Sequence, residues 1–153
     1  VEEPLLPLAR RIVNALDGEM VLIKDGDRSI YHAGACVACN YLVSLIHFGQ
    51  RFYQALGISD DLALKAFWPL IMGTLANIER KSTAAALTGP IARGDLGTLK
   101  KHLSALDARL PELAHLYREL AKYTVKVARE KGTINLKQEE LLNELLSEQQ
   151  KIV

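Results

Sequence analysis

The chain has 153 residues, 49% hydrophobic and 24% charged, a balance typical of one globular domain and unlike a disordered segment. Because 19 Lys and Arg residues stand against 18 Asp and Glu residues, there is no basic excess and we expect no nucleic-acid partner. Two cysteines are too few for a disulfide scaffold, which favours a cytoplasmic location.

The first 24 residues combine a helical pattern with a short apolar run. The opening VEEPLLPLARR has neither an initiator methionine nor the order of a signal peptide, which suggests a fragment or a processed chain. Residues 5–16 have helical periodicity, which Asp17 and Gly18 end. Residues 19–23 have the length of a strand. One strand cannot make a sheet, so this segment either pairs outside the chain or is merely extended.

After the turn at residues 25–27, every long segment has the pattern of a helix. Capping and terminating residues set the limits, among them Gly57, Asp95 and Gly132, and Asn135 with Gln138 predicts a capping box. Residues 82–95 are expected to form a loop with at most one short helical turn. The expected helices cover about residues 28–56, 60–81, 96–108, 111–131 and 136–150. The predicted fold is therefore an all-α bundle with a short αβ piece in front.

The longest predicted helix carries a narrow polar stripe. At about 100° per residue, most of its strongly polar side chains share one arc about a third of the circumference wide. The rest of the surface is apolar, which predicts a central helix surrounded by others. Residues 29–50 contain no charged side chain and are long enough to span a bilayer. Because His32, Asn40, His47 and Gln50 interrupt this run, we favour a buried helix of a soluble domain and expect no membrane partner.

Cys36 and Cys39 form a CxxC pair inside this helix. Reactive pairs place the first cysteine at a helix N-terminus, where the dipole lowers the thiol pKa, so we interpret this pair as two small buried residues. A zinc site using His32 and Cys36 would need ligands from elsewhere, and the sequence has no second cluster of cysteine and histidine. We expect no metal.

His32 and Asn40 lie two turns apart on one helix face, with small residues between them. Histidine exchanges protons and asparagine orients a carbonyl, so the stripe is a candidate for one wall of a substrate cleft, with His32 and Asn40 catalytic and Cys36 contacting substrate. The alternative is a stripe that only forms hydrogen bonds with a neighbouring helix. Geometry on the helix leaves both open.

A second polar group lies in the loop LTGPIARGD, residues 87–95. Arg93 precedes a helix N-terminus, a place suited to a carboxylate or phosphate. The alternative is an ordinary structured loop with a solvated arginine. The candidate substrate-binding residues here are Thr88, Gly89, Arg93 and Asp95, with His102 on the following helix. We expect this loop and the stripe to face one cleft.

The stretches YHAGACVACNYLVSL, ALTGPIARGDLGTLKKHLSAL and LPELAHLYRELAKYTV resemble the C-terminal helical domain of Rossmann-like oxidoreductases related to pyrroline-5-carboxylate reductase and ketopantoate reductase. The resemblance covers about residues 5–129. It implies a helical bundle like the C-terminal domain of 6-phosphogluconate-dehydrogenase-type reductases, which supplies the substrate side and forms a homodimer.

The resemblance also implies a domain organisation. Residues 1–24 would be the last helix and strand of a Rossmann domain, residues 25–132 the substrate and dimerisation domain, and residues 133–153 an added amphipathic helix. NAD(P) would be bound by the nicotinamide-binding domain upstream, since no GxGxxG motif follows a strand in this sequence. The chain alone would bind no cofactor.

One position departs from the pattern of ketopantoate reductase. The catalytic lysine of that enzyme, four residues before the asparagine that corresponds to Asn40, is replaced by Cys36. A cysteine cannot donate a proton as an ammonium does, so His32 becomes the candidate acid or base. The function expected is hydride transfer on a small polar substrate. The alternatives are a non-catalytic dimerisation module and a regulatory protein that binds a nucleotide or small anion.

Overall fold

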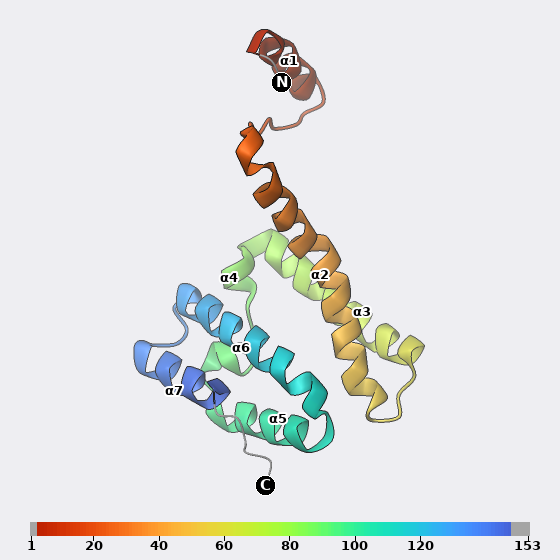
Figure 1. The fold of residues 1–153 in the computed structure, drawn as a ribbon, viewed down its shortest axis with the longest axis vertical. Helices are drawn as coiled ribbons and strands as arrows, with labels where there is room; N and C mark the ends of the chain where they lie inside the picture. The colour runs from red at the N-terminus through yellow and green to blue at the C-terminus, as the bar shows by residue number, and fades with distance from the viewer. Residues whose placement is uncertain (1–2, 148–153) are drawn as a thin grey trace. The chain divides into compact units, whose positions relative to one another are not determined.

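The computed structural model describes residues 3–147, which form helices and connecting loops without any strand (Figure 1). The α-helices are α1 (Leu6–Ala15), α2 (Arg28–Gln54), α3 (Asp60–Lys81), α4 (Thr83–Ala86), α5 (Leu96–Arg109), α6 (Pro111–Lys131) and α7 (Leu136–Ser147). Three short 3-10 turns are η1 (Glu3–Leu5), η2 (Asp25–Asp27) and η3 (Ile91–Arg93). The all-α prediction is confirmed. The chain divides into two compact units, Val1–Ile46 and His47–Val153, with α2 contributing to both.

In the first unit, α1 ends where the chain turns into a left-handed conformation. Asp17 has φ 53°, and the backbone N–H of Gly18 donates to the Val13 carbonyl at 3.0 Å. Residues 19–24 that follow have no regular structure, so of the two alternatives for residues 19–23 the chain shows the unpaired one, and pairing outside the chain remains a prediction. No neighbouring strand within residues 3–147 offers the backbone hydrogen bonds that a ladder requires, and the segment is simply extended coil.

Helix α2 follows the predicted limits closely, ending at Gln54, with Gly57 at φ 80° shortly after it. None of its residues is buried, although much of the helix is apolar. The prediction of a central helix surrounded by others is therefore wrong within this chain. The wide apolar arc indicates that the helix should be covered, but composition alone does not say which molecule covers it.

Residues Asp25–Gln54 are long and apolar enough to cross a membrane by length and composition, and this is the single such helix found in the described part of the chain. The core helix of a soluble protein can have the same length and composition. The polar side chains His32, Asn40, His47 and Gln50 would each be costly in hydrocarbon.

In the second unit, the last two turns of α2 pack against α3. Gly49 allows a close approach, since a Cβ there would lie 3.3 Å from the Phe67 ring. The rings of Tyr53 and Phe67 meet edge to face at 4.5 Å between centroids. Gln54 and Gln50 bond to the side chain and backbone carbonyl of Asp60, respectively. These contacts fix the hairpin between the two helices, yet Ala63 is the one buried residue of α3.

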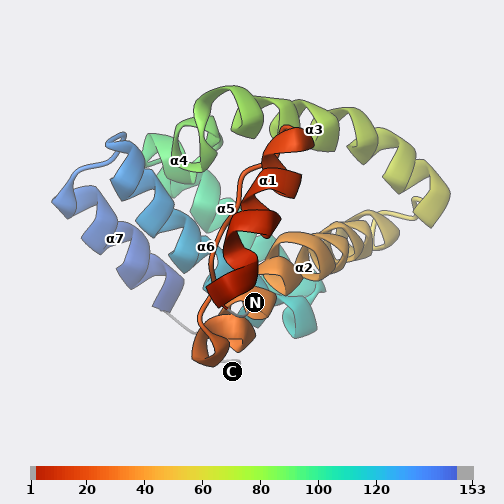
Figure 2. The same ribbon diagram turned by 90° about the horizontal axis from the view of Figure 1, so that it is seen from above.

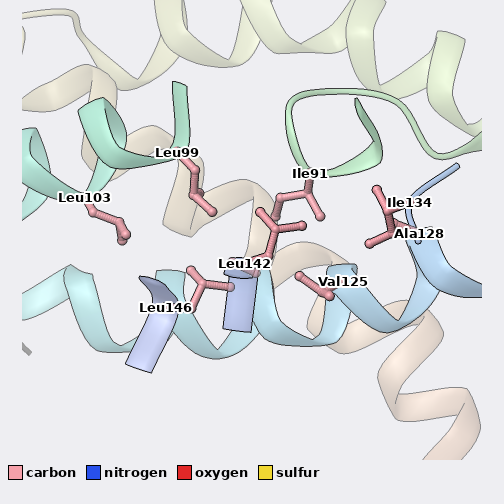
Figure 3. Packing of buried hydrophobic residues seen from close by; sticks show 9 residues of the cluster. Ile91, Leu99, Leu103, Val125, Ala128, Ile134, Leu142 and Leu146 are labelled. Atoms are coloured by element: carbon pink, nitrogen blue, oxygen red, sulfur yellow. The ribbon is translucent and has the colours of Figure 1, made fainter. Parts of the chain in front are cut away.

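The core of the second unit is built by α5, α6, α7 and the loop before α5. Figures 1 and 2 both show α6 and α7 side by side, and Figure 3 shows Leu142 of α7 reaching toward Ile91. Leu99, Val125 and Leu142 are fully buried. The cluster consists of Ile91, Leu99, Leu103, Ala121, Val125, Ala128, Ile134, Leu142 and Leu146. Helix α7 therefore docks on the bundle of its own chain.

The predicted caps of these helices are confirmed. The Asn135 side chain accepts from the Gln138 backbone N–H and the Gln138 side chain accepts from the Asn135 N–H, both at 2.9 Å, which is a reciprocal capping box. Gly132 ends α6 with φ 79°. The described part of α7 ends at Ser147, so its predicted extension to residue 150 lies outside the described residues. The divisions expected at residues 24 and 132 remain predictions.

The segment between α3 and α5 contains more helical structure than expected. It forms α4 and the turn η3, where at most one short helical turn was predicted. Ser82, at φ 116°, accepts a hydrogen bond from the Ala85 N–H and starts α4, while Pro90 starts η3 with a helical φ of −64°. Serine as an N-cap and proline at a helix start are the local signals that explain this difference.

Candidate functional site

The polar stripe of α2 lies in the first unit and is accessible along its length. His32 and Asn40 are exposed and Cys36 is half-buried. His32 Nε2 and Cys36 Sγ are 3.6 Å apart, a hydrogen bond between groups one turn apart. The hydroxyl of Ser44 donates to the Asn40 backbone carbonyl. The structure thus brings His32 and Cys36 into contact, while the role of Asn40 beside them remains a prediction.

Both cysteines are free, and Cys39 is exposed, so the interpretation of the pair as buried small residues is wrong within this chain. The reason is the lack of cover over α2 rather than the position of the residues on the helix. Residues 3–147 contain no group of three or more His, Cys, Asp and Glu side chains that could hold a metal ion.

The loop at residues 87–95 is held in place by several contacts within the second unit. The ammonium of Lys131 donates to the Leu87 carbonyl at 2.6 Å. Gly94 has φ 66°, a backbone conformation that favours glycine, and a Cβ there would lie 2.5 Å from Gln138 Nε2 and would displace that side chain. Gly89 also has a positive φ, of 96°, and Thr88 is exposed. These contacts hold the loop in one conformation against the rest of the second unit.

Asp95 has a structural role in this loop. Its carboxylate accepts from the Thr98 backbone N–H at 2.9 Å and from the Thr98 hydroxyl at 2.6 Å, so it is the N-cap of α5. These bonds, with a smaller contribution from the charge of Arg93, hold the pKa of Asp95 below its usual range. Arg93 is exposed at the same helix N-terminus, where an anion would be favourably placed.

His102 contributes to a different feature, a cavity of about 360 Å³ within the second unit. Its Nδ1 shares a hydrogen bond of 2.8 Å with the hydroxyl of Tyr117. Burial raises the pKa of Tyr117, so the phenol stays protonated and can donate to this nitrogen. The lining residues come from the end of α2, from α5 and from α6, and are Phe52, Ala55, Leu56, His102, Ala105, Leu106, Arg109, Leu110 and Tyr117.

Sequence reasoning missed the rest of this cavity. Tyr117 lies fifteen positions after His102 and meets it because α5 and α6 are joined by Leu110 alone. Arg109 lies two turns after His102 on the same face of α5, and its guanidinium donates to the Ala55 carbonyl at 2.9 Å. The spacing of His102, Ala105, Leu106 and Arg109 was the available signal, since positions i, i+3, i+4 and i+7 share a helix face.

An ion pair between α5 and α6 was also missed. Arg118 donates from both terminal nitrogens to the two carboxylate oxygens of Asp107, at 2.9 and 2.8 Å. The pair is largely buried, with side-chain exposures of 11% and 19%. The hydrogen bonds from Arg118 lower the pKa of Asp107, against the effect of burial. Its role is to hold the two helices together.

The chain was compared with known families, curated proteins and solved structures. A family model described as Domain of unknown function (DUF2520) matches residues 2–124. The searches of curated proteins and of solved structures gave no significant match. The match covers the stripe, the loop and the cavity, and stops before the end of α6. The chain therefore belongs to the DUF2520 family, whose function is unknown.

Proposed function

We propose that this chain is the helical, substrate-side and dimerisation domain of an NAD(P)-dependent oxidoreductase that acts on a small polar substrate in the cytoplasm. The proposal is supported by the resemblance of the stripe and loop sequences to the C-terminal domains of such reductases. An upstream nicotinamide-binding domain would complete the protein. Neither a membrane nor a nucleic acid is a partner in this proposal.

The observation that carries the proposal is the polar stripe on α2. Its groups are accessible, in contact one turn apart, and surrounded on the helix by small residues that leave room for a ligand. His32 would exchange a proton with the substrate, and Asn40 would orient a carbonyl or imine group. Cys36 would contact the substrate beside His32.

The described residues do not form a dinucleotide cradle. The chain contains no GxGxxG motif, and residues 19–24 form no strand from which such a motif could start. NAD(P) is therefore assigned to the upstream domain, where it would supply or accept the hydride. The proposed work of this chain is limited to binding, orienting and protonating the substrate.

The loop at residues 88–95 is the proposed anion-binding part. Arg93 would hold a substrate carboxylate, with Thr88 and the backbone around Gly89 beside it. Asp95 would contribute indirectly, by capping the N-terminus of α5, because both of its carboxylate oxygens accept hydrogen bonds from Thr98. That this loop and the stripe serve one cleft remains a prediction.

The catalytic part is tested on the intact protein, by following oxidation of NADPH with a panel of small oxo and imino carboxylates. His32→Ala and Asn40→Ala should each lower turnover by about 10²-fold or more, while Arg93→Ala should mainly raise KM. His115→Ala, which removes an exposed histidine of α6, is the matched control and should change neither. Failure of the intact protein to bind NADPH would contradict the proposal.

The dimerisation part rests on exposed apolar side chains of α2 and α3. These are Ile30, Tyr31, Val37, Tyr41, Val43, Leu45, Leu62, Leu64, Trp68, Leu70, Met72 and Leu75. Exposed apolar surface on this scale marks an interaction site. We propose a homodimer through these helices, burying a standard interface of about 1,600 Å².

Sedimentation velocity at micromolar concentration tests the dimer. The chain should sediment as a dimer, and Leu70→Glu should produce monomers because it places a charge in the interface. Leu116→Glu is the control, since Leu116 is an exposed leucine on α6 outside the proposed interface. A monomer at all concentrations would rule out this part.

One observation favours a second candidate, a non-catalytic helical dimerisation module. Cys36 stands where ketopantoate reductase, which the sequence resembles, has a catalytic lysine, so the reaction of that enzyme cannot simply be transferred. If the dimer forms but His32→Ala and Asn40→Ala leave every measurable activity and ligand affinity of the intact protein unchanged, this second candidate is the correct one.

A further inference from the structure

We propose that the cavity between the end of α2 and helices α5 and α6 binds a small amphipathic carboxylate. The apolar part of this ligand occupies the cavity, and its carboxylate lies at Arg109 and His102. The inference does not rest on the proposed reductase function, because the lining includes neither His32, Cys36 and Asn40 nor any residue of the loop at residues 87–95.

The size of the cavity sets the size of the ligand. A dry apolar cavity of about 150 Å³ holds one benzene ring. The cavity here, at about 360 Å³, is more than twice that and falls in the lower range of natural ligand pockets. A two-ring aromatic body or a medium-length alkyl chain has the matching volume.

The lining determines the chemical class. Most of the wall is apolar, with Phe52, Leu56 and Leu106 among its side chains. The Phe52 and Tyr117 rings both line the cavity with their centroids 6.3 Å apart, so together they form one aromatic wall against which a ligand ring can pack. An apolar body would therefore gain burial and ring contacts in this cavity.

The polar groups of the cavity favour an anion. Arg109 is the cation among the lining residues, and none of them is acidic. One guanidinium N–H is directed at the Ala55 carbonyl, which fixes the position of the group while leaving its other donors free for a ligand. When Tyr117 donates to His102 Nδ1, Nε2 of the imidazole carries the proton and becomes a second donor.

The nearest carboxylate on α5 does not compete for Arg109. Asp107 already accepts both of its hydrogen bonds from Arg118. An exogenous carboxylate would meet an oriented cation and an oriented imidazole N–H, the arrangement that gives strong, charge-assisted hydrogen bonds.

The test uses 2-naphthoate as the probe and 2-naphthylmethanol as its neutral counterpart, titrated into this chain by calorimetry without any nicotinamide cofactor. Naphthoate should bind with a Kd of roughly 0.1–1 mM, as expected for a ligand of its size, and more tightly than the alcohol. Arg109→Gln should weaken naphthoate about tenfold and leave the alcohol unchanged. Lys101→Gln removes another exposed cation of α5 and should change neither affinity.

The location is tested with Ala105→Trp, which fills the cavity from its wall, against Ala108→Trp, which adds the same group at an exposed position of α5 outside the lining. The first variant should abolish naphthoate binding and the second should not, with both folded by circular dichroism. Binding that survives Ala105→Trp, or equal affinity for acid and alcohol, would overturn the inference. Naphthoate binding by the monomer but not by the dimer would also overturn the inference. In that case a second copy of the chain, and not a carboxylate, would be the natural occupant of the cavity.

Discussion

The first unit and the α5–α7 part of the second unit both contain helices with an apolar face but differ in how far these faces are buried. No residue of α1 or α2 is buried, whereas α5, α6 and α7 share a core in which Leu99, Val125 and Leu142 are shielded from solvent. In the second region, short connections bring each apolar face onto the next helix of the same chain. An apolar helix face thus predicts that a cover exists, but not which helix or molecule supplies it, since α2 stays uncovered although a connection of only five residues joins it to α3.

The largest expected effect separates two neighbouring leucines of α7. Leu142 has 0% exposure and Leu141 has 39%. Leu142→Ala should lower the free energy of unfolding by about 2–5 kcal/mol, because it leaves a cavity in the core. Leu141→Ala should cost far less. Denaturant titration followed by circular dichroism measures both, and equal losses would show that α7 does not dock as described.

The same substitution at two valines compares the regions directly. Val125→Ala in the core should cost about 2 kcal/mol, while Val43→Ala in the first unit should stay within about 0.5 kcal/mol at concentrations at which the chain is monomeric. Val125 is fully buried and Val43 is 67% exposed. Thermal melts at several protein concentrations make the measurement. A loss at Val43 that grows with concentration would show that a second copy covers α2.

The ion pair between α5 and α6 should make the stability of the second unit depend on pH. Asp107→Asn should cost about 1.5 kcal/mol near neutral pH, because it removes a charge-assisted bond to Arg118. The pKa of Asp107 is lowered in the folded chain, so its contribution is complete above the unfolded pKa of about 3.9 and is lost as pH falls through the folded pKa.

The difference in the free energy of unfolding between the wild type and Asp107→Asn should therefore become smaller in acid. Unfolding of both proteins by urea between neutral pH and strongly acidic solution gives the measurement. Glu119→Gln removes the partner of Lys122 in an exposed pair and serves as the control, with a cost below about 1 kcal/mol. A constant difference for Asp107→Asn across this range would contradict the assigned ion pair.

The smallest expected effect distinguishes two residues at N-cap positions. Asp95 accepts two hydrogen bonds from Thr98, whereas Ser59 at the start of α3 makes no side-chain capping bond. Asp95→Ala should cost about 1 kcal/mol, and Ser59→Ala should stay within about 0.5 kcal/mol. Equal effects in denaturant titrations would mean that the cap contributes nothing to the stability of α5.

Most of the helical structure could be predicted from the sequence because its signals are local. Asp95, Gly132 and the Asn135–Gln138 pair each act through bonds to residues a few positions away. Predictions that depend on contacts with distant residues are less secure. Residues 19–23 have the composition of a strand, but a strand needs a partner that no local pattern provides.

The candidate site was predictable only in part. The helical spacing of His32 and Cys36 anticipated their contact, since both belong to one helix. The cavity beside His102 depends on Tyr117, which is distant in sequence and comes near only through the packing of α5 against α6. The contacts of core side chains such as Leu142 likewise depend on packing between helices that are distant in the sequence.

The docking of α7 has a consequence for synthesis on the ribosome. Of the nine core residues, Val125, Ala128, Ile134, Leu142 and Leu146 lie beyond the residues that the family model matches. As the chain is made from its N-terminus, Leu99 and Leu103 leave the ribosome before the leucines that will cover them have been translated. Leu99 and Leu103 therefore lack part of their cover until residue 146 has been made, so a chain interrupted before that point would leave apolar side chains of its core accessible.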